Sequence, residues 1–238
     1  MNDRILFCIG NYGIPFHELL IFIKMAINID RYYCYRISHI QNIHHILANG
    51  LCTKHHPKAN PNFIGIGNEE IIDIRDDTPV RIDNYGNIGE YVPFYFTPKS
   101  MMLYNIVTGY REPVVKKRAK RDIIVIRCLI EDLSKVGKFF FTDGQANVLK
   151  LTSHYKNLAD LNKIDWTIIQ QSDFRRDAAD TDKTRRYQAE FLVYEHVPAK
   201  HIESIHVYDD NAATFVRIEI AKTDLLIPVH VTTAYFFD

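Results

Sequence analysis

This sequence carries no net charge and only four cysteines, and the spacing of the cysteines limits its possible functions. Lysine plus arginine and aspartate plus glutamate number 29 each, so net charge argues neither for nor against a nucleic-acid partner. The cysteines are Cys8, Cys34, Cys52 and Cys128, and no pair has the C-x-x-C spacing of a zinc ribbon or a thioredoxin motif. We therefore expect free thiols.

Long hydrophobic runs are also missing. The apolar stretch from Leu19 to Ile29 contains Lys24 and is too short to span a bilayer. It lacks the small-residue cleavage signature of a signal peptide. With no secretory signal, a reducing cytoplasm and no membrane association are the expectation.

Several common motifs of binding and catalysis are absent. Gly65-Ile66-Gly67 lacks the third glycine of G-x-G-x-x-G because Glu70 stands there, which argues against a dinucleotide-binding Rossmann site. Neither G-x-S-x-G nor a P-loop is present, which argues against a hydrolase triad and a phosphate-gripping loop. The pairs His44-His45 and His55-His56 have no acidic or histidine partner at i+4 spacing, so no metal is expected.

Aromatic residues are abundant, at 12% of the chain, and favour strands and flat binding surfaces. Polarity and turn signals predict helices from about Phe16 and at 42–49, 69–74 and 101–107. Strands are predicted at 5–9, 32–37, 91–96, 123–130 (central), 139–142, 189–194, 202–208, 215–220 and 225–231. Pro93 indicates an edge strand or a strand start. The polar stretch 53–90 is long enough to indicate a binding loop. The lack of regular strand–helix alternation indicates an α+β fold.

Four segments carry the most specific signals in the sequence. The first is the strand-to-helix stretch Tyr35-Arg-Ile-Ser-His-Ile-Gln-Asn-Ile43, continuing to Gly50-Leu51. The second is Tyr91-Val-Pro-Phe-Tyr-Phe-Thr-Pro98 with Ser100-Met-Met-Leu-Tyr104. The third is Phe141-Thr-Asp-Gly144 with Ala146, and the fourth is Arg185-Arg-Tyr-Gln-Ala-Glu-Phe-Leu-Val193.

In order and spacing, these segments resemble the DarT family of DNA ADP-ribosyltransferase toxins over about residues 31–210. The resemblance implies an ADP-ribosyltransferase-like α+β fold, with two packed β-sheets around an NAD cleft and peripheral helices. It implies a single such domain over 31–238, with residues 1–30 as an N-terminal extension of uncertain role. It also implies a toxin of a toxin–antitoxin or phage-defence system that transfers ADP-ribose from NAD to a base of single-stranded DNA. A macrodomain antitoxin is the implied partner.

The resemblance also assigns roles to individual residues. Glu190 corresponds to the catalytic glutamate and Arg75 to the catalytic arginine, which also contacts NAD; Arg81 competes with Arg75 if the loop alignment slips. The NAD-binding residues it implies are His39, Asn42, Tyr95 and Met102. Three positions depart from the family: Ser38 stands where Thr is common, Met101 replaces a proline, and Phe174 stands in a loop that lacks a typical tryptophan.

The expected chemistry explains why these residue types are needed. Cleavage of the nicotinamide–ribose bond develops positive charge on the ribose, which a nearby carboxylate stabilises. The alternative for Glu190 is an ordinary solvent-facing residue of an edge strand. Transfer onto RNA is equally compatible with the residues, because none of them reads a 2′-hydroxyl. A more distant alternative is an inactive module that only binds NAD or nucleic acid.

Two basic clusters bear on a nucleic-acid partner. One is the run of Lys116, Lys117, Arg118, Lys120 and Arg121, for which a solvated face is the simplest interpretation. The other comprises Arg175, Arg176, Arg185 and Arg186 beside Glu190, and we expect it to bind a phosphate backbone. Its alternative is ion pairing with Asp173, Asp177, Asp180 and Asp182 on a solvated loop.

Overall fold

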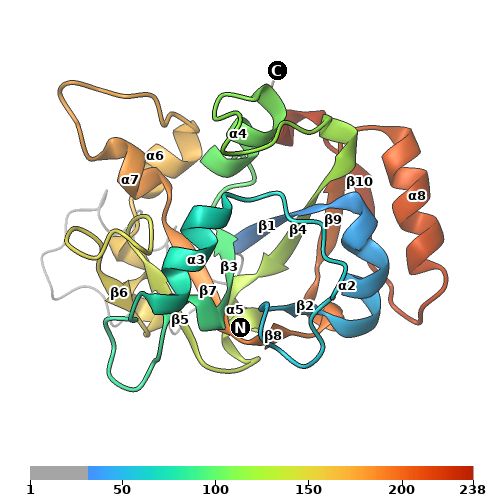
Figure 1. Ribbon diagram of the computed structural model, residues 1–238, viewed down its shortest axis with the longest axis horizontal. Helices are drawn as coiled ribbons and strands as arrows, with labels where there is room; N and C mark the ends of the chain where they lie inside the picture. The colour runs from blue at the N-terminus through green and yellow to red at the C-terminus, as the bar shows by residue number, and fades with distance from the viewer. Residues whose placement is uncertain (1–31, 238) are drawn as a thin grey trace, which may run out of the picture. The chain divides into compact units, whose positions relative to one another are not determined.

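A computed structural model describes residues 32–237, which form a mixed α+β fold (Figure 1). The strands are β1 (Tyr33–His39), β2 (Leu51–Cys52), β3 (Tyr91–Tyr95), β4 (Ile123–Leu129), β5 (Phe139–Thr142), β6 (His154–Tyr155), β7 (Glu190–Tyr194), β8 (His196–Val197), β9 (Ser204–Val207) and β10 (Val229–Val231). The α-helices are α2 (Ile43–Asn49), α3 (Glu69–Asp77), α4 (Met101–Thr108), α5 (Ile130–Ser134), α6 (Trp166–Gln171), α7 (Lys183–Tyr187) and α8 (Asp210–Ile220). The strand predicted at 5–9 and the helix predicted from Phe16 lie outside the described residues, and the N-terminal extension stays a prediction.

Eight strands join in one sheet of order β10-β9-β4-β1-β3-β7-β5-β6, and β2 pairs with β8 in a separate two-stranded sheet. All neighbours are antiparallel except β9 and β10. Strands β1 and β4 pair over seven residues, whereas β1 and β3 register only at Tyr35↔Tyr95. The large sheet therefore consists of two four-stranded halves joined at β1 and β3. The predicted fold class is confirmed.

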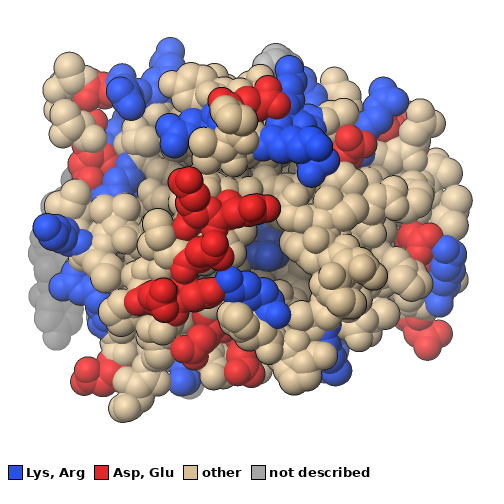
Figure 2. Space-filling model, viewed as in Figure 1, with Lys and Arg blue, Asp and Glu red and all other residues tan. Residues whose placement is uncertain are grey.

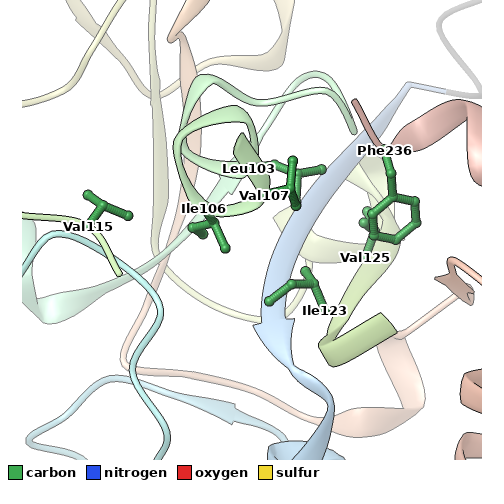
Figure 3. Close-up of a cluster of buried hydrophobic side chains, with 7 residues drawn as sticks. All are labelled: Leu103, Ile106, Val107, Val115, Ile123, Val125 and Phe236. Carbon is green, nitrogen blue, oxygen red and sulfur yellow. The ribbon is translucent and has the colours of Figure 1, made fainter. Parts of the chain in front are cut away.

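The core lies against the strongly apolar strand β4, whose first four residues are fully buried. One cluster joins α4, β4 and the C-terminal segment, with members Leu103, Ile106, Val107, Val115, Ile123, Val125 and Phe236 (Figure 3). Burial of branched side chains on such a strand contributes roughly 1.5–3 kcal/mol each before entropy is counted. The prediction that 123–130 is a central strand is confirmed, since β4 lies between β1 and β9.

Local sequence signals place several helix ends correctly. Ser100 caps α4, where its Oγ accepts a hydrogen bond from the Leu103 N–H at 3.1 Å, so the helix begins normally although Met101 replaces the family's proline. Gly50 ends α2 with φ of 81°, as predicted. A Cβ at Gly50 would lie 2.3 Å from the Val197 carbonyl oxygen, so the close approach of β8 also requires glycine.

Two predictions about the strands were wrong. Pro93 lies in the middle of β3, which is an interior strand and not an edge. The sheet accommodates it because β1 and β3 register at one position only, and the Arg36 guanidinium donates to the Pro93 carbonyl at 2.9 Å. Residues 215–220 form the end of α8 and not a strand.

The error at α8 has a local cause. Phe215-Val-Arg-Ile-Glu-Ile220 alternates like a strand, but Asp209 caps a helix that begins upstream, with its Oδ1 accepting from the Ala212 N–H at 2.9 Å. The buried residues Ala212, Ala213, Val216 and Ile220 then form a helical stripe. The C-terminal part is therefore less strand-rich than predicted, and of the strand expected at 225–231 only β10 forms. In residues 32–237, no helix is long and apolar enough to cross a membrane.

Candidate active site

Glu190 is the first residue of β7 and is 3% exposed, so it is neither solvent-facing nor on an edge strand. Its Oε2 accepts from Arg75 Nη2 at 2.7 Å, and its Oε1 accepts from the Ala146 main-chain N–H at 3.1 Å. Its own N–H donates to Thr142 Oγ1 at 3.1 Å. A buried carboxylate is stable only when such donors compensate its charge. Both oxygens of Glu190 are thus held in fixed directions.

Arg75 reaches Glu190 from α3, a helix that lies over β3 and β7 (Figure 1). Asn68 caps this helix, because its side chain accepts from the Ile71 N–H at 3.4 Å. Arg81, the competing arginine, lies on the exposed loop after α3, where its guanidinium donates to the Leu149 carbonyl. Of these two arginines, Arg75 is the one that contacts Glu190.

Tyr95 stands opposite Glu190 in the β3–β7 register. Burial raises the pKa of Tyr95 to about 12, with the Glu190 carboxylate adding to the increase and Arg75 opposing it.

Arg36 is a further member of this group that the sequence did not single out. Burial, opposed by Tyr95, lowers the pKa of Arg36 to about 10. Within residues 32–237 no ion pair to Arg36 is formed, and its guanidinium binds the Pro93 carbonyl.

A small cavity beside β1 includes Arg36 in its wall. The remaining lining residues are Ser38, Asn42, His45, Ile46, Gly50, Leu51, Cys52, Asn60 and Phe63. Figure 2 shows a hollow next to the acidic side chains that gather over α3, with basic atoms on its floor. A half-buried guanidinium without a carboxylate partner among the described residues suits an anionic group such as a phosphate.

Asn42 connects this cavity to the 53–67 loop. Its Oδ1 accepts from the Ile64 N–H, and its Nδ2 donates to the Ile64 carbonyl, both at 3.0 Å. Nδ2 also donates to Ser38 Oγ at 3.2 Å. Ser38 stands where the family commonly has threonine, and its hydroxyl accepts this hydrogen bond. The amide of Asn42 is therefore occupied with holding the loop.

His39 ends β1 and lies near Arg118 and Asp122, apart from the Arg75–Glu190 pair. Its Nδ1 accepts from the Gln41 N–H at 3.2 Å, which leaves Nε2 as the protonated nitrogen of the neutral ring. Burial lowers the pKa of His39, and Arg118 adds to the decrease while Asp122 opposes it. Met102 lies in α4 and packs, partly buried, against the hydrophobic cluster of Figure 3. This contact is typical of a residue on the core side of a helix.

The arginines before Glu190 are largely neutralised within the protein. Arg185 pairs with Asp182 and Asp143, and Arg186 pairs with Asp180, Asp165 and Asp182. Arg175 is 86% exposed in its side chain and pairs with Asp173, and Arg176 is exposed. Phe174 anchors the loop among the rings of Tyr104, Tyr187 and Phe237.

The basic run between α4 and β4 differs from this cluster. Lys116, Lys117 and Arg118 form no ion pair with the described carboxylates, whereas Arg121 lies 3.6 Å from Asp209. Lys120 lies over the Tyr208 ring at 5.2 Å. Basic side chains lie around α4 in Figure 2, with acidic ones among them. The ion pairing that the sequence offered as the alternative is formed with Asp173, Asp180 and Asp182, whereas Asp143 and Asp165 become partners of these arginines only in the fold.

Comparison with known proteins identifies the family. A family model described as "ssDNA thymidine ADP-ribosyltransferase, DarT" matches residues 35–237. The chain belongs to the DarT family. The predicted activity, NAD-dependent ADP-ribosylation of single-stranded DNA, is thereby confirmed, as is the predicted fold.

Relatives of this DarT chain agree with the assignment. A DNA ADP-ribosyl transferase of Escherichia coli O127:H6 is 36% identical over 216 residues, which cover 89% of this chain and 96% of that protein. The structure of Thermus sp. 2.9 DarT in complex with ADP-ribosylated ssDNA matches with a TM-score of 0.77 at 26% identity, over 87% of this chain and 97% of that one. The same protein in complex with NAD⁺ matches with a TM-score of 0.75 at 26% identity, over 87% of this chain and 98% of that one.

Proposed function

We propose that this chain acts as a toxin that transfers ADP-ribose from NAD to a thymidine base of single-stranded DNA, with Glu190 as the catalytic carboxylate. The observation that carries this role is the geometry of Glu190. Its carboxylate is almost fully buried, bound by Arg75 and Ala146, and placed next to Tyr95 at the junction of α3, β3 and β7.

Such a carboxylate fits the charge that develops in the reaction. When the bond between nicotinamide and ribose breaks, positive charge grows on the ribose, and a fixed anion stabilises it without reorganisation. The same carboxylate is suited to take the proton that the base nitrogen loses when it forms the new bond. Arg75 keeps Glu190 oriented and offers donors to an incoming phosphate or carbonyl oxygen.

NAD binding is assigned to residues of the first two motifs and to Arg75 between them. Arg36 and Arg75 supply positive charge for the pyrophosphate, while Tyr95 supplies a ring beside the nicotinamide. His39 presents its Nε2–H at the end of β1. Asn42 contributes by holding the loop at Ile64, and Met102 by supporting α4 from the core side.

The DNA strand is proposed to pass over the basic run that follows α4. Lys116, Lys117 and Arg118 form no ion pair with the described carboxylates, although Glu112 accepts from the Lys117 main-chain N–H at 3.1 Å. Tyr110 nearby is 67% exposed and offers a stacking surface for a base. Arg175 and Arg176 are exposed and stay candidates for the same strand. Arg185 and Arg186 are engaged in ion pairs and are weaker candidates.

A cytoplasmic location and an antitoxin with a macrodomain, which removes the ADP-ribose, complete the proposal. An enzyme that modifies template bases must be restrained in its own host. The antitoxin comes from the family resemblance, and the location from the lack of a recognisable secretory signal in the sequence.

The decisive experiment compares the wild-type chain with Glu190→Gln. The substitution keeps an acceptor for the Ala146 N–H but removes the charge, so we expect transfer to fall by on the order of 10²–10³-fold. Each protein is incubated with NAD and separate pools of single-stranded DNA, RNA and protein, and each pool is analysed by mass.

Glu203→Gln is the matched control, because Glu203 pairs with Arg127 on β4, which β1 and β3 separate from β7. It should retain transfer. Full activity of a folded Glu190→Gln protein would refute the catalytic role. If only RNA is modified, the substrate is RNA and not DNA. If the wild-type chain binds NAD but modifies none of the pools, it is a binding module and not an enzyme.

A further inference from the structure

The main-chain N–H that binds Glu190 comes from a segment with little regular structure. Ala146 lies between β5 and β6, in residues 143–152, and its N–H is 3.1 Å from Glu190 Oε1. A methyl side chain offers no polar anchor, so this N–H is only as well placed as the backbone around it. Whatever holds the segment therefore also orients Glu190.

Arg185 contacts this segment at both ends. Its Nη1 lies 3.3 Å from Asp143 Oδ1 and 3.1 Å from Thr152 Oγ1. The Arg185 carbonyl accepts from the Gln145 N–H at 3.1 Å, one residue before Ala146. Thr152 Oγ1 in turn donates to the Gln145 carbonyl at 3.0 Å. One arginine thus closes the segment into a loop and fixes the peptide next to Ala146.

The glycine of the Phe-Thr-Asp-Gly motif makes this contact possible. A Cβ at Gly144 would lie 2.1 Å from Arg185 Nη1 and 2.9 Å from its Cζ. Any larger residue would therefore displace the guanidinium. On its other side the guanidinium binds Asp182 with two bonds, Nε to Oδ1 at 2.7 Å and Nη2 to Oδ2 at 2.8 Å. The side chain is only 14% exposed.

His154 holds the opposite face of the same segment. Its Nε2 lies 3.2 Å from the Ala146 carbonyl, and its Nδ1 accepts from the Arg81 N–H at 3.0 Å. Because Nδ1 accepts, Nε2 carries the proton and donates to Ala146. His154 thus fixes the Ala146 carbonyl. The contacts of Arg185 and Thr152 with Gln145 fix the peptide that carries the Ala146 N–H.

We propose that Arg185 is a positioning residue for the transfer reaction: it holds residues 143–152 against α7 so that the Ala146 N–H meets Glu190. Glu190 follows α7 by three residues, so one short stretch of chain places both the carboxylate and its donor. The proposal rests on the catalytic role proposed for Glu190. It replaces the strand-binding role that the sequence predicted for Arg185, because its donors are used within the protein.

The test uses Arg185→Lys and the milder Thr152→Val, with Arg127→Lys as the matched control. Arg127 makes a comparable two-bond contact with Glu203 on the other half of the sheet. Lysine keeps the charge but loses the fork that joins Asp182 to the segment. We expect kcat to fall roughly 10–10²-fold in Arg185→Lys and less in Thr152→Val, because small misplacement of a reacting group is costly. The KM for NAD and the affinity for single-stranded DNA should stay within about twofold of wild type.

A spectroscopic measurement without substrates accompanies the kinetics. In the ¹⁵N-labelled protein, the Ala146 amide resonance should move upfield and exchange faster in Arg185→Lys, while Arg127→Lys leaves it unchanged. Weaker DNA binding with unchanged kcat would overturn the proposal in favour of strand binding, and an unaltered Ala146 amide would overturn it outright. If the wild-type chain shows no transfer, the proposed function fails, yet the Ala146 amide still decides whether Arg185 holds this segment.

Discussion

At the scale of single residues, the Arg75–Glu190 pair has consequences for both stability and rate. Replacing Arg75 with methionine leaves a buried carboxylate bound only by the Ala146 N–H. We expect the free energy of unfolding to fall by about 3 kcal/mol, and kcat to fall by on the order of 10²-fold. Arg81→Met is the comparison and should lower both by less, because it removes only a bond to the Leu149 carbonyl and none to Glu190. Denaturant unfolding and steady-state kinetics measure the two effects, and equal losses in both variants would contradict the assignment of Arg75.

Glu190 was predicted because it lies in the fourth motif, and Arg75 from its position ahead of the second motif. The motifs could not predict the donor to Glu190 Oε1, since the Ala146 N–H is a main-chain group and carries no residue signature. Arg36 stood inside the first motif but was not selected. Its lack of a carboxylate partner among the described residues is a property of the fold, and the sequence alone gives no sign of it.

A second residue-scale prediction concerns His206, which lies in β9 between Ser204 and Thr232. Burial lowers its pKa to about 4, and Arg127 and His230 add to the decrease while Glu203 opposes it. The unfolded histidine titrates near 6.5. Between these values the unfolded state binds more protons, so the free energy of unfolding should fall as pH drops from 6.5 towards 4. Denaturant titrations at several pH values should show a shallower decline in His206→Gln; an identical decline would exclude this cause.

At the scale of elements, most predictions that rested on strong periodicity were confirmed. Strands β1, β3, β4, β5, β7 and β9 and helices α2, α3 and α4 lie within a few residues of their predicted positions. The short elements α5, α6, α7, β2, β6 and β8 were not predicted, because two to six residues give too little pattern to distinguish them from loops. Helix α8 was predicted as a strand because the window of alternation began after its cap and its first buried residues.

The cap of α8 leads to an element-scale prediction. Asp209→Ala removes the acceptor for the Ala212 N–H, and we expect the protein to lose about 1 kcal/mol of stability. Asp209→Asn keeps the cap and loses only the attraction to Arg121 at 3.6 Å, which is exposed and contributes roughly 0–1 kcal/mol. Thermal or denaturant unfolding compares the two. A loss in Asp209→Asn as large as that in Asp209→Ala would assign the effect to the ion pair.

At the scale of the whole molecule, a chain of zero net charge distributes its charges unevenly. Acidic side chains gather over α3, whereas the surface around α4 carries basic side chains with acidic ones among them (Figure 2). Five carboxylates, those of Asp143, Asp165, Asp173, Asp180 and Asp182, face three of the four arginines that precede Glu190. Attraction for a polyanion should therefore come mainly from the run after α4, where Lys116, Lys117 and Arg118 form no ion pair with the described carboxylates.

This distribution predicts how binding responds to salt. In a Glu190→Gln background, replacing Lys116, Lys117 and Arg118 with glutamine should weaken binding of single-stranded DNA at every sequence tested. The slope of log affinity against log salt should flatten by roughly 0.7 for each phosphate that the variant no longer neutralises. Replacing Arg175 and Arg176 should change the slope less, because Asp173 already binds Arg175. Fluorescence titrations at three or more salt concentrations measure both slopes. A flattening confined to the Arg175 and Arg176 variant would instead place the strand over the loop before Glu190, as the sequence alone predicts.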